Sequence, residues 1–133
     1  ARIDELIAKL AEIYKLFHGR PYVPFVPEFR ELSLHVYEVV NSMANTYIVK
    51  DDEGHAVLID CGYVSGAPIA ANPHRFIDHL TARMQSELGV ETVEYFLPTH
   101  FHDDHLAGYA MLKARYGSKV VAASDLRELL EHP

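Results

Sequence analysis

The sequence predicts an α/β fold, α+β in the strict classification, in which one sheet is flanked by helices and an extra helix precedes it. Two observations support this prediction. Hydrophobic residues make up 49% of the 133 residues, which is enough for the packed core of one domain. After a group of β-rich runs, helix and strand patterns alternate to the end of the chain, which is typical of a sheet covered by helices on at least one face.

The chain begins with the pattern of an amphipathic helix over residues 3–17. Apolar residues recur at intervals of three and four, which places them on one side of a helix that ends near Gly19. The members of this apolar stripe are Ile3, Leu6, Ile7, Leu10, Ile13, Tyr14 and Phe17. We expect the stripe to pack against another part of the molecule.

A proline-rich stretch, "RPYVPFVPEF", follows the helix. Its prolines at 21, 24 and 27 restrict φ and lack an N–H donor, so they exclude a helix and disfavour a central strand. We interpret the stretch as an extended connector, and a proline motif that binds a partner is the alternative. The sequence therefore predicts a helix and linker over residues 1–31 and a folded unit over residues 32–133.

Three β-rich runs follow the connector: "LSLHVYEVV" from residue 32, "NTYIVKD" from residue 45 and "AVLIDCG" from residue 56. The turn sequence "KDDEGH" predicts that the last two runs form a hairpin. Asn72 before Pro73 is typical of a helix start, and the apolar spacing that follows predicts a helix as far as Gly89.

Strand and helix patterns alternate in the last third of the chain. "VEYFL" from residue 93 predicts a strand, and it is followed by a predicted helix over residues 105–116 that ends at Gly117. "KVVAA" from residue 119 predicts another strand, and Ser124 predicts the cap of a final short helix.

Charge and cysteine content narrow the range of functions. The 19 acidic and 12 basic residues leave a formal charge of -7, which argues against nucleic acid as a partner. The single cysteine cannot form an internal disulfide, and no apolar run reaches the roughly 18 residues of a membrane span. Because the N-terminal helix also carries charges where a signal peptide is apolar, we expect a soluble, cytoplasmic protein.

The stretch "LPTHFHDDHLAG", residues 97–108, concentrates histidine and aspartate between a strand and a helix. His100 and His102 are two apart, so in an extended segment their side chains leave on the same side. Asp104 and His105 follow where the chain turns into the helix. Imidazole and carboxylate are ligands that zinc, iron and manganese accept, so these four groups indicate a site for one metal ion or for two.

Other interpretations apply to single residues of this stretch. Asp103 alone is better explained as an N-cap, because the first helical turn offers free N–H groups to its carboxylate. Either His100 or His102 alone would be interpreted as an exposed loop residue, but the four residues together favour a metal site. Gly108 indicates a close backbone approach, because glycine in a helix costs about 1 kcal/mol relative to alanine.

The spacing H-x-H-x-D-H after a strand resembles the signature of the metallo-β-lactamase fold superfamily. The residues that match it are His100, His102, Asp104 and His105. The upstream "NTYIVKDDEGHAVLIDCG" is similar to the N-terminal hairpin of that superfamily, in which a strand ending in Asp-x-Gly, here residues 60–62, lies close to the metal loop. The resemblance covers residues 34–131, and it implies an αββα sandwich of which this chain forms the N-terminal half.

The resemblance also implies a role for each residue of the motif. His100 and His102 would bind a first metal, and Asp104 and His105 a second, which gives Asp104 a part in catalysis. Zinc is the expected metal, with iron or manganese as alternatives. Asp60 would hydrogen-bond the loop that carries the histidines, although by residue type alone it is equally an aspartate that ends a strand at a turn.

A metal-dependent hydrolase is the function that the resemblance implies, with metal-activated water attacking an ester, thioester, lactone, amide or phosphodiester of a small-molecule substrate. A non-haem iron redox enzyme of the same fold and a non-catalytic binding module are the alternatives. Cys61 is expected to be a small buried residue and not a ligand.

Further ligands of the superfamily come from the later half of its fold, and this sequence has no counterpart to them. After His105 only His132 and Asp125 offer the same side chains, and neither stands where the superfamily places its ligands. We therefore expect the chain to be part of a larger protein, with weak zinc binding and almost no activity by itself. Its uncovered sheet face would then be shared in a homo-oligomer.

Overall fold

The computed structural model describes residues 2–18, 27–40, 42, 44–61 and 73–125. In this part of the chain, six strands form one mixed sheet in the order β1-β2-β3-β4-β5-β6. The strands are β1 (Glu28–Ser33), β2 (Val36–Val40), β3 (Thr46–Lys50), β4 (His55–Ile59), β5 (Thr92–Leu97) and β6 (Lys119–Val120). The helices are α1 (Arg2–His18), α2 (Pro73–Leu88), α3 (Asp103–Leu106) and α4 (Tyr109–Tyr116).

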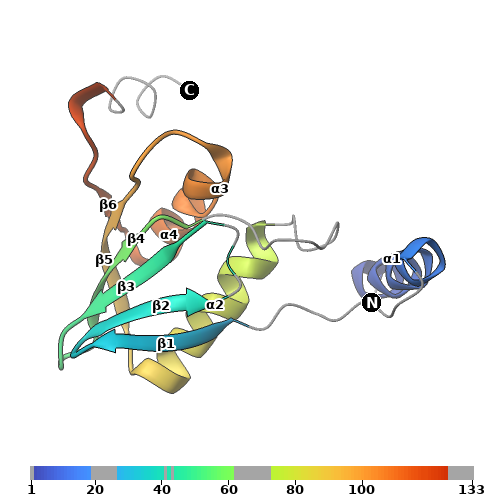
Figure 1. The fold of residues 1–133 in the computed structure, drawn as a ribbon, viewed down its shortest axis with the longest axis horizontal. Helices are drawn as coiled ribbons and strands as arrows, with labels where there is room; N and C mark the ends of the chain where they lie inside the picture. Colours follow the sequence, from blue (N-terminus) through green and yellow to red (C-terminus); the bar gives the residue numbers. More distant parts are fainter. Residues whose placement is uncertain (1, 19–26, 41, 43, 62–72, 126–133) are drawn as a thin grey trace.

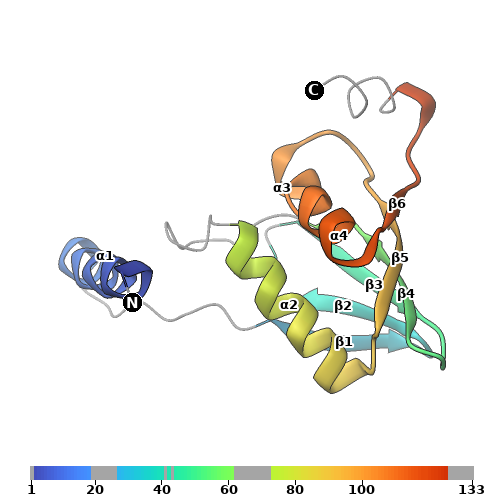
Figure 2. The ribbon, with the colours of Figure 1, turned by 180° about the vertical axis from the view of Figure 1, so that it is seen from behind.

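The sheet is antiparallel at one end and parallel at the other. β1 to β4 are antiparallel neighbours, whereas β4, β5 and β6 are parallel. Parallel neighbours need a crossover, and α2 lies between β4 and β5 in the sequence as α3 and α4 lie between β5 and β6. The sheet lies in front of α2 and α4 in Figure 1 and behind them in Figure 2, so both helices cover one face. This confirms the predicted fold class.

The core lies between the sheet and these two helices. Every second residue of β3 and β4 points into it, as expected for strands with one covered face, and α2 contributes a stripe spaced by three and four residues. The largest of these fully buried side chains are Ile48, Leu58, Phe96, Ile77, Leu80, Met84 and Leu112. Burial of each such side chain contributes about 1.5–3 kcal/mol, so this layer holds α2 and α4 against the sheet.

The predicted hairpin and the predicted helix before β5 are both confirmed. β3 pairs with β4 across the acidic turn, where Gly54 adopts a φ of 89° that favours glycine. α2 ends at Gly89 with φ 68°, and the N–H of Val90 donates to the carbonyl of Met84 at 3.1 Å. This is the hydrogen bond that closes a helix when the residue after its end is left-handed.

The β-rich run at residues 32–40 does not form one continuous strand, because the chain reverses within it. His35 lies in the turn between β1 and β2 with a φ of 68°, a left-handed value that histidine adopts more readily than β-branched residues do. β1 starts at Glu28, inside the stretch interpreted as connector, and Phe29 pairs with Val39 of β2. Pairing with β2 gives this segment backbone partners that its proline-rich flank did not suggest.

The prediction of one helix through residues 105–116 is wrong, because α3 and α4 are separate. The break falls at Gly108, whose N–H donates to the carbonyl of Cys61 at 2.9 Å and therefore leaves the helical pattern. α4 ends as predicted at Gly117, which has a φ of 68°. The strand expected at residues 119–123 is short, since β6 contains only Lys119 and Val120.

α1 forms as predicted, but four residues of its apolar stripe are exposed. Ile3 is 68% exposed and Leu6 54%, and Leu10 and Ile13 are also exposed. The helix lies apart from the sheet in both ribbon views (Figures 1 and 2). The expectation that this stripe packs against another part of the molecule is therefore not met by these four residues.

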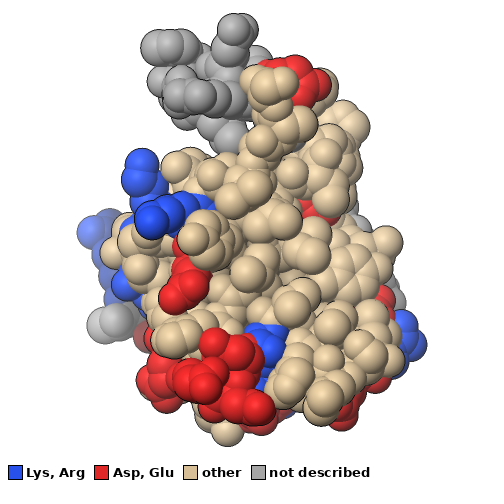
Figure 3. All heavy atoms as spheres, turned by 90° about the vertical axis from the view of Figure 1, so that its left-hand side faces the viewer, with Lys and Arg blue, Asp and Glu red and all other residues tan. Residues whose placement is uncertain are grey.

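Acidic side chains gather at the lower end of the face drawn in Figure 3. The turn between β3 and β4 carries Asp51, Asp52 and Glu53 in succession.

Within the described ranges, none of the helices is both long enough and apolar enough to cross a membrane. The predicted connector at residues 19–26, the Asn72 cap and most of the final helix lie outside the described residues.

Candidate metal centre

The parallel pairing of β4 with β5 brings two distant residues to the same edge of the sheet. Carboxyl ends of parallel strands lie together, and the N–H of Asp60 extends this pairing by donating to the carbonyl of Leu97 at 3.0 Å. Asp60 directly follows β4, and Thr99 stands two residues after β5. The two side chains therefore meet although they are 39 residues apart in the sequence.

Asp60 is a buried carboxylate with donors on both oxygens. Its Oδ1 accepts the backbone N–H of Thr99 at 2.7 Å, and its Oδ2 accepts the Thr99 hydroxyl at 2.7 Å. His105 Nδ1 lies 2.8 Å from the same Oδ2, a close contact without the alignment of a hydrogen bond. Because Asp60 is only 3% exposed, these contacts replace the water that a free carboxylate would need.

The backbone at Asp60 is strained to achieve this arrangement. Its φ is 55°, in the left-handed region that side chains rarely adopt, although aspartate tolerates it better than most. Such strain costs on the order of 1 kcal/mol and persists only where surrounding contacts over-determine the conformation. Here the three contacts of the Asp60 carboxylate hold the backbone in this conformation. They also place a negative charge next to the histidine loop.

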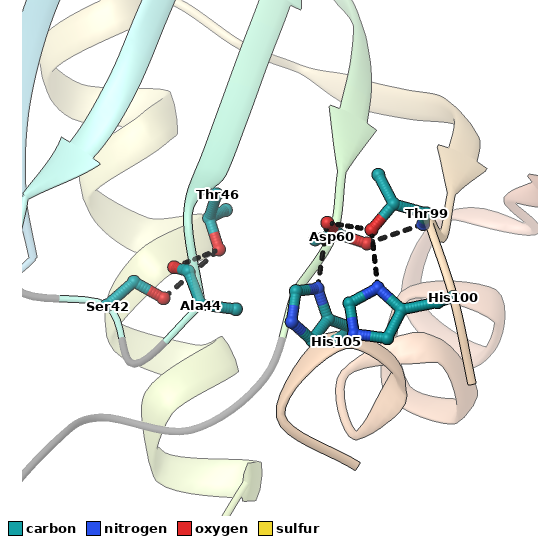
Figure 4. A network of polar contacts seen from close by, with 7 residues as sticks. All are labelled: Ser42, Ala44, Thr46, Asp60, Thr99, His100 and His105. Carbon is teal, nitrogen blue, oxygen red and sulfur yellow. Dashed lines mark hydrogen bonds and ion pairs between the residues drawn. The ribbon is translucent and has the colours of Figure 1, made fainter. Parts of the chain in front are cut away.

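Three imidazole rings of the histidine loop cluster together near Asp60. The ring centroids of His100 and His105 are 3.8 Å apart, and those of His100 and His102 are 4.7 Å apart. Figure 4 shows Asp60, Thr99, His100 and His105 directed toward one another. His100 Nδ1 lies 2.9 Å from the Thr99 hydroxyl oxygen, so His100 is joined to Asp60 through Thr99.

Cys61 and Gly108 hold the loop onto the end of β4. The N–H of Cys61 donates to the carbonyl of His105 at 2.9 Å, and Gly108 returns a bond to the Cys61 carbonyl. A Cβ on Gly108 would lie 2.6 Å from Cys61 Sγ and 2.8 Å from Ile77 Cδ1, so a larger residue would have to displace these buried side chains. This explains the close approach that the sequence indicates at Gly108.

Cys61 is fully buried, as the sequence analysis expects. Burial first, and then the negative charge of Asp60, raise the pKa of its thiol far above its ordinary value. Because metals bind the thiolate, this environment disfavours Cys61 as a ligand.

Two predicted residues are described only by their backbone. Asp103 and Asp104 open α3, and their side chains lie outside the described residues. The His102 carbonyl accepts the N–H groups of His105 at 2.9 Å and of Leu106 at 3.2 Å. His102 therefore stands at the N-cap and Asp103 at the first helical position, so the sequence interpretation of Asp103 as the cap is displaced by one residue.

Within the described side chains, which do not include Asp104, no group of three or more histidine, cysteine, aspartate or glutamate residues is arranged to hold one ion. The histidines nevertheless suit a metal in their chemistry. Neutral imidazole binds through one nitrogen while the other is held by a carboxylate or hydroxyl. The hydrogen bond of His100 uses Nδ1, which leaves Nε2 as the nitrogen for a metal.

Thr99 is the residue that the sequence analysis missed. Its hydroxyl and its N–H both bond to Asp60, and its hydroxyl also contacts His100. The one signal in the sequence is a hydroxyl residue directly before the first histidine of the motif, where the chain leaves β5. Nothing local to residues 97–108 reveals that the acceptor is a carboxylate at the end of another strand.

Comparison with known proteins gives one family model, described as the metallo-beta-lactamase superfamily, which matches residues 40–133. A metallo-β-lactamase from Cronobacter sakazakii, a mutant of its HARLDQ motif, superposes with a TM-score of 0.56 at 26% identity over 80% of this chain and 38% of that chain. FIM-1 from Pseudomonas aeruginosa in its mono-zinc form has a TM-score of 0.56 at 17% identity, covering 80% of this chain and 46% of that one.

A metallo-β-lactamase from Hirschia baltica is similar to the same degree, with a TM-score of 0.56 at 17% identity over 79% of this chain. The chain spans 47% of that structure, so it covers less than half the length of each of these three solved proteins.

Proposed function

The chain belongs to the metallo-β-lactamase superfamily, and from this premise we propose that it supplies metal ligands, and the network that supports them, to a hydrolase site. One observation carries the proposal. A single buried carboxylate, Asp60, contacts both Thr99 and His105 and thereby gathers the histidine loop at the end of β4 and β5. Membership of the superfamily supports a metal-dependent, hydrolase-like function.

The ligands in this proposal are those of the H-x-H-x-D-H motif. His100 and His102 contribute to a first metal position, and Asp104 and His105 contribute to a second. Zinc is the metal we propose, because imidazole and carboxylate suit it and because one structural neighbour is a mono-zinc form. When bound, such an ion supplies Lewis acidity, which lowers the pKa of water and polarises a substrate carbonyl or phosphoryl group.

Asp60 supports the ligands and does not join them. Its negative charge lies beside Nδ1 of His105 and, through the Thr99 hydroxyl, beside Nδ1 of His100. A carboxylate in that position orients each ring and makes its other nitrogen a better electron-pair donor. Removing such partners typically costs about 10- to 100-fold in metal affinity, so Asp60 matters to the site without touching substrate.

The activity of a complete protein is part of the proposal. The chain spans only 38–48% of the length of several solved metallo-β-lactamases that it matches, and the remaining ligands of the site would come from outside it. Hydrolysis of an ester, thioester, lactone, amide or phosphodiester is the reaction class we propose. The fold alone does not decide among these substrates.

Metal analysis of the full-length protein tests the proposal, with His100→Ala as the test variant and His79→Ala as its control. His79 lies exposed on α2 and takes no part in the loop. We expect stoichiometric zinc in the natural protein and in His79→Ala, and a loss of zinc and of hydrolytic activity in His100→Ala. Stoichiometric iron in place of zinc would contradict the hydrolase and favour redox chemistry. Identical metal content and activity in all three proteins would contradict a role for the motif.

A further inference from the structure

We propose that Thr99 is a positioning residue that holds His100 in the tautomer with its proton on Nδ1, so that Nε2 faces a metal. The inference rests on the proposed function, and it deepens that function by assigning a role to a residue outside the H-x-H-x-D-H motif. Thr99 precedes His100 directly and follows β5 by two positions. Three hydrogen bonds of Thr99 carry the argument.

The direction of these hydrogen bonds follows from the number of protons available. A threonine hydroxyl has one proton to donate and two lone pairs to accept with, whereas an ionised carboxylate only accepts. The Thr99 hydroxyl lies 2.7 Å from Asp60 Oδ2, so it donates its proton there. The same oxygen lies 2.9 Å from His100 Nδ1, and it has no second proton to give. His100 must therefore be the donor in that contact, through Nδ1–H.

A second hydrogen bond between Thr99 and Asp60 stabilises the arrangement in which the Thr99 hydroxyl donates to Asp60. The Thr99 N–H donates to Asp60 Oδ1 at 2.7 Å. The carboxylate therefore binds both the backbone and the hydroxyl of Thr99, which keeps the hydroxyl in place. Asp60 is buried, and a charged acceptor makes a hydrogen bond roughly twice as strong as a neutral one does. Rotation of the hydroxyl proton away from Asp60 toward His100 would forfeit that bond.

The tautomer of His100 decides what the ring offers to a metal. A neutral imidazole has one nitrogen that carries a proton and one that carries a free lone pair. The hydrogen bond at one nitrogen decides which of the two carries the proton. With the proton on Nδ1, the lone pair is on Nε2, which is the nitrogen remote from Thr99. His102 provides an internal comparison, because its described side-chain contacts are ring contacts with His100 and Phe101.

Nitrogen NMR of the metal-free 133-residue chain tests this inference directly. Long-range proton–nitrogen spectra, recorded above the pH range in which the histidines titrate, distinguish Nδ1–H from Nε2–H. We expect His100 as Nδ1–H in the natural chain and in Thr99→Ser, which keeps the hydroxyl. In Thr99→Val, which keeps the shape and removes the hydroxyl, we expect His100 to shift toward Nε2–H while His102 stays unchanged.

Several outcomes would overturn the inference. Predominant Nε2–H at His100 in the natural chain would do so, and this measurement needs no variant to fold. An unchanged Nδ1–H in a folded Thr99→Val chain would do so as well. If Thr99 had a purely structural role, Thr99→Ser and Thr99→Val would affect His100 only in proportion to the stability that each variant loses. Thermal unfolding of each variant measures that loss and so identifies this alternative.

Zinc titration of the same three proteins connects the inference to the proposed function. We expect Thr99→Val to weaken zinc binding by about tenfold or more, and Thr99→Ser to bind as the natural chain does. A shifted tautomer with unchanged zinc affinity would overturn the role of Thr99 in presenting Nε2. Failure of the full-length protein to bind any metal would instead contradict the proposed function, and it would leave the tautomer result standing.

Discussion

Asp60 combines two properties that are each uncommon in folded proteins. It is buried to 3% exposure while carrying a charge, and its φ of 55° lies in the left-handed region. Each property alone is unfavourable, and the contacts with Thr99 and His105 offset both. The residue therefore marks the place where the fold accepts strain in order to support a site.

Substitution of Asp60 separates its charge from its backbone conformation. Asp60→Gly removes the strain, and Asp60→Asn keeps the shape but replaces a double acceptor with one donor and one acceptor. We expect both variants to lose about 1–3 kcal/mol of unfolding free energy in urea titration, because the Thr99 donors lose a charged acceptor. A glycine variant as stable as the natural chain would show that strain, and not the hydrogen-bond network, dominates at this position.

At the scale of elements, the helical segment after the histidine loop is divided by a contact with β4. Gly108 separates α3 from α4 because its backbone approaches Cys61, to which it also donates a hydrogen bond. The segment from Thr99 to Gly108, which includes α3, is held at both ends, by Asp60 at Thr99 and by Cys61 at Gly108.

Gly108→Ala tests this packing. Alanine favours helix by about 1 kcal/mol, but the added Cβ would meet Cys61 Sγ at 2.6 Å, and overpacking of a core typically costs about 1–3 kcal/mol. We expect net destabilisation in chemical denaturation. Because the nearest atom is that sulfur, Cys61→Ala combined with Gly108→Ala should recover part of the loss. Strictly additive effects of the two substitutions would argue against the contact.

The hairpin of β3 and β4 depends on one ionised side chain in its turn. Asp51 Oδ1 accepts the N–H of Glu53 at 2.9 Å and that of His55 at 2.8 Å. The backbone hydrogen bond from His55 is the main cause that holds the pKa of Asp51 below its ordinary value of 3.8. Because the pKa of Asp51 is lower in the folded chain, this stabilisation is complete above the ordinary pKa of 3.8. It is lost as the pH falls through the lower pKa of the folded state.

Asp51→Ala should therefore destabilise the chain at neutral pH and reduce the loss of stability on acidification below about pH 4. Glu53→Ala is the matched control, because it removes an acidic side chain from the same turn while the Glu53 N–H still reaches Asp51. Melting temperatures of the three proteins from neutral to acidic pH provide the measurement. Parallel curves for the natural chain and Asp51→Ala would be inconsistent with the role of this turn.

At the scale of the whole molecule, and within the described residues, helices α2 and α4 cover one face of the sheet and leave the other open. Opposite to the buried Ile48 and Leu58, apolar side chains pair across β3, β4 and β5 in two rows. These rows are Tyr47 with Ile59 and Leu97, and Val49 with Val57 and Tyr95. Val49 is 37% exposed and Tyr95 36%, so an apolar patch faces away from α2 and α4.

We propose that the isolated chain covers this patch by forming a homo-oligomer, with the open faces of two copies in contact. Light scattering should then give a mass above the 15.0 kDa of one chain. Val49→Lys, in the middle of the patch, should shift the chain toward the monomer. Leu34→Lys, at an exposed hairpin turn, should leave the mass unchanged. A monomer at high concentration for the natural chain would disprove the oligomer.

The sequence by itself determined the elements whose information is local. Apolar spacing and terminal glycine mark α1 and α2, turn chemistry marks the β3–β4 hairpin, and H-x-H-x-D-H marks the histidine loop. These patterns suffice because a helix or hairpin is set by residues a few positions apart. The local pattern fails at Gly108, where a distant partner, Cys61, interrupts the predicted helix.

Only the tertiary structure decided which residues support the histidines. Asp60 and Thr99 are 39 residues apart, and they meet because β4 and β5 run parallel with their carboxyl ends at one edge. Thr99 has no distinguishing local pattern, and its role depends on a carboxylate whose proximity no local spacing predicts. The break at Gly108 likewise depends on Cys61, which is distant in sequence and adjacent only after the sheet has formed. Residue types of a site can thus be recognised along the chain, but the contacts that orient them arise from strand pairing and packing.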